Sequence, residues 1–157
     1  MKEKKEFLKE KFIDFQLRIA QLNLDLHKQE DAFAARQKEL YLNLFEILDA
    51  FEAIEETIQA KEETMDKTAR LLSRNIRAIH RKILRMLQAN HVSRIEFPDR
   101  MARMDYCKVL ETREIPDLKN ETIITIVKNG YIHEGTGAVL RKAEVITVMN
   151  AREGSEG

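Results

Sequence analysis

The sequence predicts an α+β protein, in which a long N-terminal helix and a shorter helix precede a small C-terminal all-β domain. Apolar residues recur in steps of four and three through the first part of the chain, as in helices that pack on other helices. Beyond His91 the chain changes to short segments rich in β-branched residues, separated by proline and glycine. We therefore expect a helical dimerisation region at 1–91, a β domain at 92–150 and a disordered tail at 151–157.

The composition excludes several classes of protein. Basic and acidic residues number 27 each, so the chain has no excess charge to attract nucleic acid or an anionic membrane surface. No apolar stretch approaches the roughly 20 residues that span a bilayer. Cys107 is the only cysteine, which excludes an intrachain disulfide. We expect a soluble, cytoplasmic protein that binds neither nucleic acid nor membranes.

The first predicted helix runs from about residue 5 to about residue 62, without glycine or proline to interrupt it. A second apolar row at Tyr41, Phe45 and Leu48 widens the stripe beyond what a two-stranded seam buries, and so predicts a bundle. The seam of the N-terminal part consists of Leu8, Phe12, Phe15, Ile19, Leu22 and Leu26. A further row there, which a two-helix coiled coil would leave uncovered, consists of Ile13, Leu17, Ala20 and Leu24.

The second predicted helix runs from about 66 to about 90, with Asp66 as its N-cap and Asn90 as a left-handed stop. Two chains that each contribute both helices form a four-helix bundle and bury both wide apolar faces. Because a lone helix pair would expose a large apolar surface, we expect an obligate homodimer. The residues expected at this interface are Leu40, Leu44, Ile47, Phe51, Ile54, Ile58, Leu72, Ile76, Ile79 and Ile83.

The β domain is predicted from four segments: "VSRIEF", "CKVLETRE", "ETIITIVKN" and "AVLRKAEVITV". The intervening "PDRMARMDYC" is expected to be irregular or briefly helical. In the last segment, alternation places Arg141 on the same strand face as Ala143 and Val145. A guanidinium does not stay in an apolar interior without a partner, so we expect the strand to twist or end such that Arg141 reaches solvent.

The closing segment "IVKNGYIHEGTGAVLRKAEVITV" resembles the end of the GrpE family, the nucleotide exchange factors of DnaK-type chaperones. A second segment, "LFEILDAFEAI", is similar to the part of the family's long helix that enters the bundle, and Asp49 fits it. The residues that match the closing pattern are Gly130, Tyr131, Leu140, Arg141, Ala143, Val145 and Val148.

The resemblance implies a homodimeric, non-enzymatic co-chaperone that binds the nucleotide-binding domain of a DnaK-type chaperone and promotes ADP release. It implies no cofactor, no metal and no catalytic residue. Arg141 is implied as a partner-binding residue, together with Val127, Leu140 and Tyr131. The family's Asp-Pro-x-x-His-x-Ala element is absent, so the alternative is a dimeric coiled-coil adaptor or structural protein that keeps the fold and binds another partner.

Other interpretations of the same residues stay open from the sequence alone. Arg141 is also consistent with a solvated strand residue, and Asp49 and Glu52 with a solvated helix face. The four histidines have no metal-ligand spacing. Cys107 is expected to be a half-buried strand cysteine. The basic run at 74–85 is typical of an amphipathic bundle helix that lies opposite an acidic face of the first helix.

Overall fold

The structure, a computed structural model, describes residues 1–151 and confirms the α+β class. It separates into two compact units, Met1–Tyr41 and the chain from Leu42 onward. The helical region at 1–91 and the β domain at 92–150 stay predictions of domain organisation. The tail predicted at 151–157 lies, except for Ala151, outside the described residues.

Helix α1 runs from Lys2–Lys61, over 60 residues, because the sequence offers no glycine or proline to interrupt it. In the first unit, all residues from 1 to 40 are exposed, including both apolar rows. The polar side-chain contacts there are local, such as the Gln21 amide donating to Asp25 at 3.0 Å. None of the helices described within 1–151 is both long and apolar enough to span a membrane.

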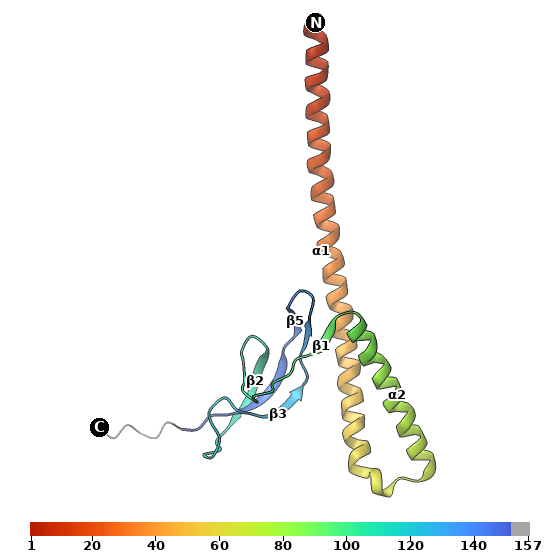
Figure 1. Cartoon of the computed structure of the whole chain (residues 1–157), viewed down its shortest axis with the longest axis vertical. Helices are drawn as coiled ribbons and strands as arrows, with labels where there is room; N and C mark the ends of the chain where they lie inside the picture. Colours follow the sequence, from red (N-terminus) through yellow and green to blue (C-terminus); the bar gives the residue numbers. More distant parts are fainter. Residues whose placement is uncertain (152–157) are drawn as a thin grey trace, which may run out of the picture. The chain divides into compact units, whose positions relative to one another are not determined.

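A short 3₁₀ turn, Glu62–Thr64, follows α1, and helix α2, Lys67–Ala89, then folds back along the last part of α1 (Figure 1). The N-cap prediction is confirmed, because the Asp66 carboxylate accepts a 2.7 Å hydrogen bond from the Ala69 backbone N–H. The left-handed stop predicted at Asn90 is wrong by one residue. Asn90 keeps a φ of −97° while its side-chain amide donates to the Met86 carbonyl, and His91 takes the positive φ of 59°.

Two three-stranded sheets follow, and Figure 1 labels β1, β2, β3 and β5. The first sheet has the order β1-β4-β5 and is antiparallel. In the second, of order β2-β6-β3, β6 pairs in parallel with β2 and antiparallel with β3. The strands are β1 (Val92–Arg94), β2 (Cys107–Arg113), β3 (Ile123–Lys128), β4 (Tyr131–His133), β5 (Ala138–Arg141) and β6 (Ala143–Val148).

The prediction of a single strand at "AVLRKAEVITV" is wrong. The strand is interrupted at Lys142, so that the residues before it belong to β5 of the first sheet and those after it to β6 of the second. The last hairpin of the chain is therefore β4–β5, and β6 becomes the central strand of the second sheet. The "PDRMARMDYC" segment is irregular, as one of the two predictions had it, and forms turns instead of a helix. Buried residues of the second sheet form a core of Cys107, Ile123, Ala143 and Val145.

The row Tyr41, Phe45 and Leu48 on α1 is buried within the chain itself. The Phe45 ring stacks on Tyr131 of β4, with the centroids 4.1 Å apart and the planes within 5°. The prediction that other helices of a bundle cover this row is wrong at Phe45, which is covered by a strand. Apolar periodicity marks a face that must be covered, but a sheet covers it as well as a helix does.

Candidate functional site

Arg141 ends strand β5 and points at helix α1 instead of at solvent. Its guanidinium donates to both carboxylate oxygens of Asp49, at 2.7 and 2.6 Å, and to the backbone carbonyl of Asn129 at 2.7 and 3.1 Å. Only 17% of the Arg141 side chain and 19% of the Asp49 side chain are exposed. The expectation that Arg141 reaches solvent is therefore wrong, because α1 supplies the partner that a shielded guanidinium requires.

The environment of Arg141 keeps it charged. Burial alone would lower the pKa of Arg141, but the hydrogen bonds and the negative charge of Asp49 outweigh it and raise the pKa. Two parallel N–H···O bonds to one carboxylate also fix the relative orientation of the two groups, which a single contact does not do.

A second ion pair lies one helical turn along α1. Arg94, at the end of β1, donates to the Glu52 carboxylate at 2.8 Å, and the Asn129 amide donates to both oxygens of Glu52 at 2.8 Å. The solvated face expected for Asp49 and Glu52 is therefore wrong. Residues at i and i+3 share a helix face, and this face carries the β strands. We call Asp49, Glu52, Arg94, Asn129 and Arg141 the helix–strand network.

The strand residues of this network stand in one row across the first sheet. Tyr131 of β4 pairs in register with Arg94 of β1 on one side and with Arg141 of β5 on the other. The guanidinium carbon of Arg141 lies 5.5 Å from the Tyr131 ring centroid and 5.4 Å from that of Phe45. An aromatic stack thus lies between two ion pairs, and the three contacts join the sheet to α1.

Burial decides the properties of Tyr131. Its side chain is almost fully buried, and burial, followed by the nearby Glu52 carboxylate, raises the pKa of the Tyr131 hydroxyl. The hydroxyl oxygen has no hydrogen-bond partner within the described part of the chain. Tyr131 therefore contributes as an aromatic ring more than as a polar group.

Gly130 lets the two sheets approach each other at this point. A Cβ atom there would lie 2.5 Å from the Ala143 nitrogen and 2.9 Å from the Arg141 carbonyl oxygen, closer than a real Cβ comes. Only glycine fits without moving the backbone. Gly130 lies between the end of β3 at Lys128 and the start of β4, and the next residue, Tyr131, stacks on Phe45.

The other two predicted partner-binding residues lie nearer the surface. Val127, the next-to-last residue of β3, is 48% exposed, and Leu140 of β5 is partly exposed. Val127 lines an open hollow of about 410 Å³, together with Glu52 and Glu56 of α1 and His80 of α2. Of the four predicted partner-binding residues, Tyr131 and Arg141 belong to the contacts between the first sheet and α1, whereas Val127 and Leu140 are more accessible.

The predicted dimerisation residues form an apolar surface along α1 and α2. Within the chain, Phe51 stacks on His80 with the ring centroids 5.5 Å apart, and Ile58 is buried. Arg77 donates to the Glu55 carboxylate at 2.8 Å, so the acidic face expected opposite the basic run is confirmed at this pair. Those with at least 40% of their surface exposed are Leu40, Ile47, Ile54, Leu72 and Ile79, and those partly exposed are Leu44, Phe51, Ile76 and Ile83.

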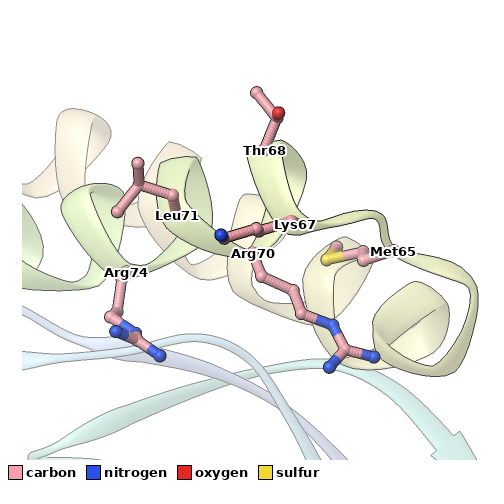
Figure 2. A pocket seen from close by; sticks show the side chains of 6 residues that line it. All are labelled: Met65, Lys67, Thr68, Arg70, Leu71 and Arg74. Carbon is pink, nitrogen blue, oxygen red and sulfur yellow. The ribbon is translucent and has the colours of Figure 1, made fainter.

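A second hollow, of about 460 Å³, lies where α2 begins (Figure 2). Figure 2 shows Arg70 and Arg74, one turn apart, extending to the same side of α2. Both arginines are exposed, as are Lys67 and Leu71. Exposed, flexible basic side chains do not define a ligand, so we assign none to this hollow.

Neither Cys107 nor a metal cluster offers catalytic chemistry in the described residues. Cys107 is 1% exposed, more buried than expected, and its thiol donates to the Arg103 carbonyl at 3.1 Å. Between residues 1 and 151, no group of three or more histidine, cysteine or carboxylate side chains is arranged to hold a metal ion.

The roles of Arg94 and Asn129 were missed by sequence reasoning. Arg94 lies 42 residues from Glu52, and Asn129 lies 77 residues from it, so no local spacing connects them. A signal was nonetheless present: Phe45, Asp49 and Glu52 share one face of the predicted helix, and a carboxylate pair on the buried side of a helix needs a basic partner.

Comparison with known proteins identifies the family of the chain. No curated protein matches the chain. The model of the GrpE family matches residues 1–149, which include both helices and both sheets. The chain therefore belongs to the GrpE family, whose general role is that of a nucleotide exchange co-chaperone.

Proposed function

We propose that this protein promotes ADP release from a DnaK-type chaperone by binding the chaperone's nucleotide-binding domain. The observation that carries the proposal is the family match over residues 1–149, because it includes the helices and the β strands together. The alternative from the sequence, an adaptor that keeps the fold and binds another partner, is separated from it by experiment below.

Exchange of this kind requires binding energy and no covalent chemistry. A ligand shifts a conformational equilibrium only by its difference in affinity for the two states. A protein that binds the opened, nucleotide-free form of the chaperone more tightly than the closed form therefore favours loss of ADP. No cofactor is needed for this role, and a cytoplasmic location remains the expectation from the sequence.

The partner-binding roles of Arg141, Val127, Leu140 and Tyr131 stay predictions, and their exposure supports dividing them. Val127 and Leu140 are accessible and are proposed to contact the chaperone directly. Tyr131 is 1% exposed, and the Arg141 guanidinium is paired with Asp49. Their proposed contribution is to hold the surface that the other two present.

A homodimer is the proposed assembly, in agreement with the family's general tendency to dimerise. The exposed residues Ile47 and Ile54 of α1 and Leu72 and Ile79 of α2 support it, since apolar patches of this kind usually mark an interface. Light scattering tests it: a dimer is expected at micromolar concentration, and a compact monomer would contradict it.

The test of function uses a DnaK-type chaperone loaded with fluorescent ADP. Adding the purified full-length protein is expected to accelerate ADP release, with a rate that saturates as the chaperone is filled. Val127→Asp should weaken the effect, whereas Lys67→Ala, on the exposed start of α2, serves as a control. Unchanged release at saturating protein would exclude exchange activity and favour the adaptor.

A further inference from the structure

We propose that Asp49 and Arg141 are positioning residues for partner recognition. They fix the first sheet and the Asn129 backbone on helix α1, and thereby fix where Leu140 of β5 and Val127, near the end of β3 in the second sheet, are presented. For its partner-binding part the inference rests on the function proposed above. It assigns Arg141 a role through Asp49, within its own chain, instead of a direct contact with the chaperone.

The first sheet is held to α1 at both of its edges. In the order β1-β4-β5, Arg94 ends one edge strand and Arg141 ends the other. Arg94 pairs with Glu52 at 2.8 Å and Arg141 with Asp49 at 2.6 Å. Two attachments on opposite edges prevent a rotation that either one alone would allow.

The ion pairs and the aromatic stack that lies between them differ in how strongly each depends on orientation. Stacking of Phe45 on Tyr131 removes apolar surface from water, but apolar contact is largely non-directional. A guanidinium that donates to both oxygens of a carboxylate is directional, and a shielded pair that loses its geometry leaves charges unpaired. The stack therefore attracts the sheet to α1, and the pairs select one orientation.

Asn129 connects the helix–strand network to the proposed contact surface. Asn129 donates through its amide to Glu52 and accepts through its carbonyl from Arg141. Val127 is two residues earlier in the chain, at the end of β3, and Leu140 directly precedes Arg141. A release of the network therefore frees the two backbone segments that carry the exposed residues.

The experiment compares the parent with Asp49→Asn, which keeps the size of the side chain and removes its charge. Spin labels at Ala50→Cys and Ala138→Cys, both exposed positions, report the distance between α1 and β5 in full chains diluted with unlabelled protein. The native Cys107 is buried, so its protection from a thiol reagent shows that the β strands remain folded. The control is Arg113→Ala, which removes an exposed ion pair with Glu111 on β2.

The expected result is a narrow distance distribution in the parent and in Arg113→Ala, and a broadened one in Asp49→Asn with Cys107 still protected. Affinity for the chaperone should fall about tenfold in Asp49→Asn, a size typical of energetic coupling between contacting residues. Exchanging the two residues, Asp49→Arg with Arg141→Asp, should recover part of the affinity.

Two results would overturn the inference: an unchanged distance distribution in Asp49→Asn, or a broadened one with unchanged chaperone affinity. If Asp49→Asn exposes Cys107, Arg141→Lys, which keeps the charge and loses the fork, takes its place under the same criteria. Should the parent fail to accelerate ADP release, the proposed function fails, but the distance measurement still decides whether the network fixes the sheet.

Discussion

Two stretches of helix α1 have similar sequence patterns and different surroundings. Residues 2–40 and residues 41–58 each carry an apolar seam and a second apolar row. In the first stretch every residue is exposed, whereas in the second Tyr41, Phe45, Leu48 and Ile58 are buried. The comparison teaches that periodicity specifies which faces of a helix need cover, and that the chain's own strands and second helix can provide it.

The charged contacts of the two stretches differ in the same way. The His27–Glu30 contact has side chains 74% and 62% exposed, and even with a protonated imidazole an exposed pair of this kind contributes at most about 1 kcal/mol. The Asp49–Arg141 pair is shielded and bidentate, and breaking one partner leaves an uncompensated charge. Ion pairs in the second stretch should therefore affect stability and orientation more than those in the first.

Truncation of a buried ring should give the largest effect. Phe45→Ala is expected to lower the free energy of unfolding by about 4 kcal/mol, because it removes a fully buried side chain and its stack on Tyr131. Phe7→Ala, at an exposed position outside both rows of the first stretch, should change it by less than about 0.5 kcal/mol. Urea unfolding measures both, and equal costs would remove the contrast between the stretches.

A charge introduced into the contact between α1 and α2 should have the next largest effect on stability. Phe51→Asp is expected to cost about 3 kcal/mol of stability, because it removes the ring that stacks on His80 and places a carboxylate at a half-buried position, where it loses hydration. The melting temperature is the readout. An unchanged melting temperature would show that Phe51 lies on a solvated surface and would contradict its assignment to the apolar seam of α1.

An exposed seam residue of the second stretch tests the proposed homodimer interface. Ile47→Asp should weaken the proposed homodimer by about 2 kcal/mol, roughly thirtyfold in dissociation constant, while Cys107 stays protected. Ala50→Asp, exposed and outside the predicted interface, is the matched control. Light scattering over a concentration series provides the test. An Ile47→Asp protein that dimerises like the parent would exclude Ile47 from the interface.

The smallest effect is expected at the Tyr131 hydroxyl. Tyr131→Phe should change stability at neutral pH by less than about 1 kcal/mol, because the lost hydroxyl has no hydrogen-bond partner within residues 1–151. The raised pKa of Tyr131 means that the unfolded chain ionises first, so stability should decline as pH rises above about 10. The decline should be smaller in Tyr131→Phe, and identical alkaline unfolding curves would contradict this.

Local features of the sequence were sufficient to predict the helices, the Asp66 cap and most of the strands. They were sufficient because period, capping residue and β-branched content act over a few residues. Alternation placed Arg141 on one strand face with Ala143 and Val145, and this was wrong, because Arg141 ends β5 of the first sheet whereas Ala143 and Val145 lie in β6 of the second. The break at Lys142 was not predicted, since it follows from the pairing of β5 and β6 with different sheets.

The network itself depends on contacts that no sequence window contains. Asp49 and Arg141 are 92 residues apart, and their pairing requires that β5 end where it faces α1. The rule that a guanidinium avoids an apolar interior without a partner was sound. Applied to Arg141, it gave the wrong prediction of a solvated side chain, because the partner, Asp49, lies far away in the sequence. The carboxylates of α1 are also compatible with a solvated helix face, so the sequence did not single out Asp49 as a partner.

The central claim is that Asp49 and Arg141 act on each other to join the first sheet to α1. A double-mutant cycle measures this directly, from urea unfolding of the parent, Asp49→Ala, Arg141→Ala and the double variant at one protein concentration. We predict a coupling free energy of about 2 kcal/mol, with the double variant less destabilised than the sum of the single ones. Additive effects, with a coupling below about 0.5 kcal/mol, would contradict the account.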